Sequence, residues 1–218
     1  MICPVCGEDC CTRHFDIWWD PKKFNWRKHS WKLAFCCAEH FHKWWDPNKY
    51  NWQEASADLA VGCSHYFCVW WNPSKYNWCR GSYALTKFCS KYFHIWWDPN
   101  KFNWIQGSHG LAVYCGDYFE TWWNSDRFNW KAASWALAQF CSKYFQVWWD
   151  PNKFNWQRSS WTLAQYCSDY FQIWWDPDRY NWAQNTQALK EYCFEYRHIW
   201  EEDVKLRRLL AGKDLHTT

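Results

Sequence analysis

The sequence predicts an all-α solenoid with seven helical repeats of 26 residues, an N-terminal metal-binding cap and a C-terminal capping helix. One aromatic cassette recurs every 26 residues along the 218-residue chain. Apolar residues inside each period keep helical spacing, and both ends of the chain leave the pattern. Repeats of this kind bury their apolar faces against neighbouring repeats rather than around one central core. The recurring tryptophans are Trp18, Trp44, Trp70, Trp96, Trp122, Trp148 and Trp174.

The N-terminal cap, residues 1–17, is rich in potential metal ligands. A CPVCG turn supplies two cysteines, and a cysteine and a histidine follow with the four-residue spacing of one helix face. Such a set suits tetrahedral zinc, which would stiffen the exposed end of a solenoid. Cys11 is an alternative to Cys10, although it also falls in the repeat register; the other interpretation is free thiols and a surface histidine. The predicted zinc ligands are Cys3, Cys6, Cys10 and His14.

Residues 18–199 hold the repeats, and the sixth repeat illustrates their expected structure. Asp150 followed by Pro151 predicts the start of a short helix or turn, and Ser160 predicts the cap of a second, longer helix. An alternative break at Ser168 gives two short helices followed by a DPNKFNW loop, which is an ankyrin-like arrangement. The pattern is compatible with either division.

Polar positions recur as regularly as apolar ones. Most repeats carry an Asp-Pro pair followed by a cation, and all carry an Asn before the next tryptophan. This uniformity indicates that these residues have the same role in every repeat. The cations could steer phosphates while neighbouring rings stack on bases, with Lys101, Arg127 and Lys153 on the track. Alternatively, each cation pairs with the Asp three residues earlier and the tryptophans pack between repeats. The cation row is Lys23, Lys49, Lys75, Lys101, Arg127, Lys153 and Arg179.

Eight of the fourteen cysteines also recur at the repeat period. Stacked helices lie roughly 8 to 10 Å apart, whereas a disulfide needs Cα atoms within about 7 Å. These cysteines are therefore predicted to be buried thiols in a reducing intracellular compartment, the cytoplasm, with a virion as the alternative. The periodic cysteines are Cys11, Cys37, Cys63, Cys89, Cys115, Cys141, Cys167 and Cys193.

The C-terminal segment, residues 200–218, leaves the pattern. Trp200 keeps the first aromatic residue of the repeat, and Glu201 to Leu210 then has the pattern of a charged amphipathic helix. A helix with one polar face is what the end of a solenoid requires, because no further repeat covers it. This segment is predicted to cap the array.

Composition and motifs narrow the classes of function. The net charge of +3 is too small to indicate a nucleic-acid or membrane partner by itself. No apolar run approaches the roughly 18 residues of a membrane-spanning helix, and the first residues lack the apolar core of a secretory signal. Phosphate-binding glycine loops, nucleophile elbows and metalloprotease helices are also missing from the sequence. We therefore expect a soluble protein that is not an enzyme.

The repeated cassette resembles a known group of proteins. Its order is WWDP, a cation, an aromatic residue and NW, followed by S, LA, C and YF. This order resembles tryptophan-rich tandem-repeat proteins of giant DNA viruses, some of them loosely ankyrin-like. The resemblance covers residues 11–200 and implies a repeat fold and a viral source, with no established activity.

One position varies between repeats on this constant frame. Such variation is typical of the binding face of a solenoid, and equally of an unconstrained solvent face; exposed indoles favour binding. The sequence therefore predicts a scaffold that binds a protein through Trp31, Tyr83, His109, Trp135 and Trp161. The alternatives are single-stranded nucleic-acid binding along the cation row, and a structural rod that self-associates in a larger, viral assembly. The variable row is Trp31, Ala57, Tyr83, His109, Trp135, Trp161 and Gln187.

Overall fold

A computed structural model of the chain describes residues 2–9 and 11–203. It confirms the predicted fold class: the protein is all-α, and each repeat consists of an 11-residue helix, a short 3-10 turn, a four-residue helix and a loop. The chain forms two compact units, Met1–Tyr118 and Phe119–Thr218. The predicted C-terminal capping helix lies mostly outside the described residues.

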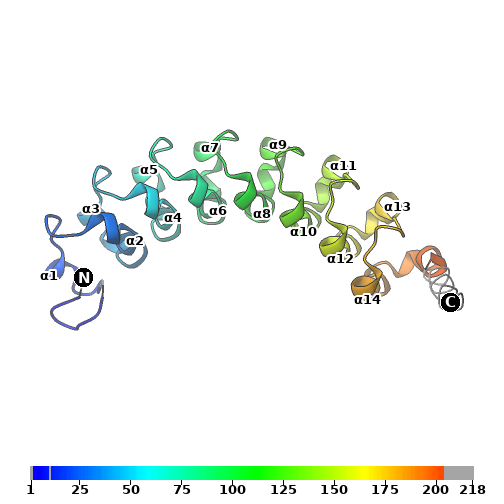
Figure 1. Cartoon of the computed structure of the whole chain (residues 1–218), viewed down its shortest axis with the longest axis horizontal. Helices are drawn as coiled ribbons and strands as arrows, with labels where there is room; N and C mark the ends of the chain where they lie inside the picture. Colours follow the sequence, from blue (N-terminus) through cyan, green and yellow to red (C-terminus); the bar gives the residue numbers. More distant parts are fainter. Residues whose placement is uncertain (1, 10, 204–218) are drawn as a thin grey trace, which may run out of the picture. The chain divides into compact units, whose positions relative to one another are not determined.

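In the first unit, long and short helices alternate along the chain. Figure 1 shows the long helices α2, α4, α6 and α8 side by side in one layer, with α3, α5 and α7 in a second layer. Within this unit α2 packs against α4, α4 against α6, and α6 against α8. The helices are α1 (Phe15–Trp18), α2 (Trp26–Cys36), α3 (Phe41–Trp44), α4 (Trp52–Gly62), α5 (Phe67–Trp70), α6 (Trp78–Phe88), α7 (Phe93–Trp96) and α8 (Trp104–Tyr114).

The second unit repeats this arrangement, with α10, α12 and α14 packed in sequence. After α14 the chain is again helical from Arg197 to Asp203. The helix runs past Trp200, where Glu201 to Asp203 replaces the Trp-Asp-Pro that follows the short helix in most other repeats. The helices are α9 (Phe119–Trp122), α10 (Trp130–Phe140), α11 (Phe145–Trp148), α12 (Trp156–Tyr166), α13 (Phe171–Trp174) and α14 (Trp182–Tyr192).

The predicted helix start at Ser160 is wrong. The N-cap of α12 is Asn155, whose side-chain oxygen accepts a hydrogen bond from the Arg158 amide at 3.4 Å. Ser160 lies buried inside the helix, where its hydroxyl donates to the Trp156 carbonyl at 2.7 Å and accepts from the Asn181 amide at 3.2 Å. Asn is as strong an N-cap residue as Ser, but the prediction considered only Ser160 for this helix.

The alternative division of the repeat is closer to the structure. Helix α12 ends before Cys167, and Ser168–Tyr170 forms a 3-10 turn that leads into α13. Asp150 does not start a helix: its carboxylate accepts a hydrogen bond from the Asn152 amide at 2.9 Å and shapes the loop before Asn155. The DPNKF segment is therefore a turn between the short helix and the next long one.

The aromatic composition is explained by a core that repeats with the helices. Trp148 is 1% exposed, and its indole N–H donates to the Cys141 carbonyl at 2.9 Å. Phe145 stacks on Trp149 in its own repeat and on Tyr170 in the next, with ring centroids 5.1 and 4.5 Å apart. Such aromatic pairs add to the stability that burial provides.

The invariant asparagine joins neighbouring repeats as well as capping its own helix. The Asn155 side-chain amide donates to the Lys131 carbonyl at 2.6 Å, and its backbone amide donates to the Ser134 hydroxyl at 3.1 Å. A single side chain thus satisfies a helix N-terminus and a carbonyl of the preceding helix. The same side-chain bond to the preceding repeat is made by Asn51, Asn77, Asn103 and Asn181.

We expect Asn155→Asp to lower the free energy of unfolding by about 1 to 3 kcal/mol. Aspartate keeps the capping oxygen but cannot donate to the Lys131 carbonyl, and it places a negative charge against that oxygen. Urea denaturation followed by circular dichroism measures the loss. Asn152→Asp is the matched control, because Asn152 lies in the exposed loop and Asp178 occupies its equivalent position. Equal stability of the two variants would contradict the assigned role.

The periodic cysteines are buried thiols, as predicted. Cys167 and Cys193 donate S–H bonds to the carbonyls of Ala138 and Ala164 in the preceding repeat, at 3.6 Å in both cases. Burial raises the pKa of these thiols to about 12, so they stay protonated and remain donors. The row therefore contributes packing and weak hydrogen bonds between repeats.

Candidate metal centre and binding face

Three cysteines and one histidine converge at the N-terminus, in front of α1. One ligand atom from each residue lies within 4.8 Å of all the others. Cys3 and Cys11 are buried, His14 is half-buried and Cys6 is exposed. This cluster could hold a metal ion, and three sulfurs with one imidazole nitrogen are the donor set of tetrahedral zinc. The cluster consists of Cys3, Cys6, Cys11 and His14.

The CPVCG turn brings the first two ligands together. Gly7 has a positive φ of 73°, and its amide donates to the Cys3 carbonyl at 2.9 Å, which closes the turn. The Val5 amide donates to the Cys3 sulfur at 3.4 Å. The His14 Nδ1 atom lies 3.5 Å from the sulfurs of both Cys3 and Cys11. The Cys3 sulfur thus faces an amide of its own turn and the imidazole of His14.

The pKa values of these thiols reflect their crowding. Burial opposes ionisation of Cys3, but hydrogen bonds from the backbone of Cys6 and Val5 outweigh it and lower its pKa to about 7. A backbone hydrogen bond at Glu8 lowers the pKa of Cys6. Burial and the neighbouring Cys11 and Cys3 outweigh it and raise that pKa to about 11. A shared cation would offset the cost of ionising Cys6 beside Cys3 and Cys11, so the donor set fits a metal ion.

The fourth predicted ligand, Cys10, lies outside the described residues, whereas Cys11 is part of the cluster. Cys11 also keeps its place in the repeat, because its carbonyl accepts the Trp18 indole N–H at 2.7 Å. The sequence does carry a signal for this ligand set: two residues separate Cys11 from His14, just as two residues separate Cys3 from Cys6. The prediction chose Cys10 instead, because Cys10 and His14 have the four-residue spacing of one helix face.

The variable row lies on the solvent side of the long helices. The opposite side of each helix packs its leucine and alanine against the neighbouring repeat. Trp31 is 42% exposed and Trp161 is 37% exposed. Tyr83, His109 and Trp135 are half-buried, and the rings of Tyr83 and His109 stack at 5.4 Å. All five predicted binding aromatics of this row therefore present part of their rings to solvent.

The second unit carries an outward aromatic surface that the sequence analysis missed. Rings five residues after the variable row pack against it: Trp135 with Phe140 at 6.2 Å and Trp161 with Tyr166 at 6.4 Å. Gln165 donates to the Tyr192 hydroxyl at 3.2 Å and so connects α12 to α14. The sequence signal is an aromatic pair at i and i+5. We call this surface the aromatic strip: Trp135, Phe140, Trp161, Tyr166 and Tyr192.

The three track residues of the cation row have close partners. Lys101 pairs with Asp98 at 3.6 Å, the spacing predicted for a local ion pair. Lys153 reaches back to Asp126 in the preceding loop at 2.7 Å, and Arg127 also has interactions within the protein. Much of the positive charge of the row is therefore neutralised by neighbouring groups.

A polar cavity of about 280 Å³ lies between α2 and α4, beside Trp31. Asp58 lines it from a position that holds a small side chain in most other repeats. Burial raises the pKa of this carboxyl group from 3.8 to about 6. Because the pKa is raised in the folded state, the stability contributed by protonated Asp58 is present below about pH 4 and is lost as the pH rises through 6.

We therefore expect Asp58→Asn to make the protein more stable than wild type at pH 8, and to remove part of the loss of stability between pH 5 and pH 8. The effect is about 1 kcal/mol, since the carboxylate is only half-buried and solvent screens its charge. Urea denaturation at the two pH values measures it. An unchanged difference between pH 5 and pH 8 would show that Asp58 does not titrate as described.

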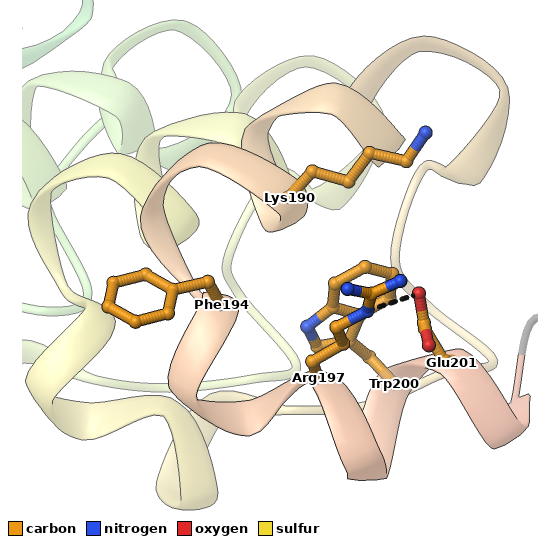
Figure 2. A pocket seen from close by; sticks show the side chains of 5 residues that line it. All are labelled: Lys190, Phe194, Arg197, Trp200 and Glu201. Atoms are coloured by element: carbon orange, nitrogen blue, oxygen red, sulfur yellow. Dashed lines mark hydrogen bonds and ion pairs between the residues drawn. The ribbon is translucent and has the colours of Figure 1, made fainter.

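A second cavity, of about 290 Å³, lies at the C-terminal end beyond α14. Figure 2 shows Arg197, Trp200 and Glu201 grouped together, with Lys190 and Phe194 pointing away from them. Arg197 and Glu201 form an ion pair at 2.6 Å. The charged groups beside Trp200 thus satisfy each other, which does not favour a ligand site in this cavity.

Comparison of the chain with protein-family models, with curated proteins and with solved structures finds no match. Tryptophan-rich tandem repeats of 26 residues are nevertheless evident in the structure. Among the described helices, none is long and apolar enough to cross a membrane.

Proposed function

We propose that this protein is a non-enzymatic repeat scaffold that binds a protein partner through the outward faces of its long helices. The supporting observation is that its aromatic residues fall into two sets, one buried and constant, the other exposed and variable. One set, represented by Trp148, is buried and repeated without change, while the variable row is partly exposed and changes among Trp, Ala, Tyr, His and Gln from repeat to repeat, with Trp at three of its seven positions. A constant frame with a variable, aromatic outer face suits recognition of a protein surface.

The ion pairs of the cation row favour this function over nucleic-acid binding. Cations that already pair with Asp98 or Asp126 release fewer counterions on meeting a phosphate backbone. If the row were a nucleic-acid track, single-stranded DNA or RNA would quench tryptophan fluorescence saturably, with a steep dependence on salt. We expect no saturable quenching at low salt. A structural rod of a viral assembly is the remaining alternative, and it predicts self-association and weak binding of soluble ligands.

We also propose that the N-terminal cluster binds one structural zinc ion through Cys3, Cys6, Cys11 and His14. Four protein ligands leave no open position for substrate, so the ion would stiffen the cap rather than catalyse a reaction. Buried thiols that act as hydrogen-bond donors between repeats suit a reducing compartment, which fits a metal site of cysteines.

Selection from a displayed library of random peptides tests the proposed binding function. The expected result is a set of peptides that bind wild-type protein and bind Trp31→Ala, Trp161→Ala or both at least tenfold more weakly. The matched control is Trp45→Phe, which changes an indole of the stacked core. Selected peptides that bind both outer-face variants as tightly as wild type would refute the assignment of the face.

A further inference from the structure

The aromatic strip has a composition that limits its ligand. The strip and the polar positions between its rings, Gln139, Gln165, Gln187 and Glu191, contain no lysine or arginine. The one carboxylate, on Glu191, accepts a hydrogen bond from Gln187 at 2.8 Å. A surface of rings, amides and a single negative charge disfavours phosphate-bearing ligands and suits an uncharged peptide.

The spacing of the strip suggests the conformation of that peptide. Helices α10, α12 and α14 pack side by side, and packed helices lie roughly 8 to 10 Å apart. A polyproline II helix advances about 9 Å in each turn of three residues. An extended peptide that crosses the three helices would therefore place one residue of each turn against the rings of each helix.

We propose that the aromatic strip binds a proline-rich segment of the partner protein in the polyproline II conformation. This inference rests on the proposed binding function. Proline rings would lie against Phe140 and Trp161, which are 41% and 37% exposed, and against Tyr192, which is 40% exposed. Aromatic-lined surfaces take such ligands because the polyproline conformation is already ordered before binding.

The polar groups of the strip distinguish this ligand from an α-helix. A polyproline II backbone makes no internal hydrogen bonds, so its carbonyls need donors from the binding surface. Gln139 and Gln165 occupy the same position of α10 and α12, directly before Phe140 and Tyr166 in the sequence, and the Gln165 amide donates to the Tyr192 hydroxyl at 3.2 Å. A helical ligand has satisfied its own carbonyls and gains little from amide donors.

Fluorescence anisotropy of labelled decaproline, with a glycine-serine peptide of equal length as control, tests the proposal. We expect saturable binding of decaproline alone, roughly tenfold weaker binding to Trp161→Ala and nearly unchanged binding to Trp161→Phe and Trp31→Ala. Circular dichroism first establishes that each variant is folded. The Trp161→Phe variant keeps a ring in the strip, and Trp31 lies in the other unit.

Two results would overturn the inference, and each can be distinguished from a result that refutes the proposed binding function. Decaproline that does not bind at about 1 mM, while library peptides without proline bind and depend on Trp161, would leave the binding face intact and exclude this ligand. Decaproline binding that is equal in wild type and Trp161→Ala would place the contact elsewhere on the protein.

Discussion

Trp148→Ala is expected to lower the free energy of unfolding by about 3 to 5 kcal/mol, one of the largest losses available to a single substitution here. The indole is 1% exposed and its N–H bonds to the Cys141 carbonyl at 2.9 Å. Removing it leaves a cavity and takes one hydrogen bond from the Cys141 carbonyl, which keeps its bond from the Tyr144 amide at 2.9 Å. Urea denaturation followed by far-ultraviolet circular dichroism measures the change.

Trp161→Ala is the matched control for that experiment. The same residue type is removed, from α12 instead of α11. The Trp161 ring is partly exposed, and within the described residues its indole nitrogen makes no hydrogen bond. We expect a loss of about 1 kcal/mol. A Trp148→Ala variant as stable as Trp161→Ala would mean that the buried tryptophan row does not hold the repeats together.

Cys11→Ser should weaken zinc binding on the order of a hundredfold or more, and removal of zinc should destabilise the cap. Structural zinc contributes about 10 to 16 kcal/mol to small metal-dependent folds, so a cap of seventeen or so residues depends strongly on it. Competition with a chromophoric chelator measures affinity, and native mass spectrometry measures stoichiometry. Hydrogen exchange of the Phe15–Trp18 amides should quicken after chelation.

The Cys10→Ser variant tests whether Cys10 or Cys11 is the fourth zinc ligand. The cluster geometry includes Cys11, so Cys10→Ser should keep one zinc ion per chain with nearly unchanged affinity. Cys79→Ser, at an exposed cysteine outside the cap, controls for zinc bound adventitiously by other thiols. Loss of zinc in Cys10→Ser with retention in Cys11→Ser would contradict the proposed ligand set.

The repeat architecture was predictable because every structural role recurs. Period, core tryptophans and buried cysteines all follow from residues that keep their identity at 26-residue intervals. The helix boundary was not predictable in the same way, because Asn155 and Ser160 are both good N-cap residues. Only the packing decides between them: Ser160 bonds across to the next repeat, which needs it inside the helix.

The candidate sites were predictable in part. The cap was recognisable from its cysteines, but the choice between Cys10 and Cys11 depends on how the CPVCG turn folds back onto His14. The variable row was apparent from its changes between repeats. The aromatic strip was not predicted: Phe140 and Tyr166 contact the row within their own helices, at a spacing of five residues that was overlooked, and Tyr192 joins it only when α14 packs against α12.

The most direct test of the whole account is the binding of a library-selected peptide to Trp161→Ala, measured beside the unfolding midpoint of the same variant. The division of the tryptophans into a structural set and a binding set predicts an unfolding midpoint close to wild type and binding weakened at least tenfold. Undiminished binding by a folded Trp161→Ala protein, for every selected peptide, would contradict it.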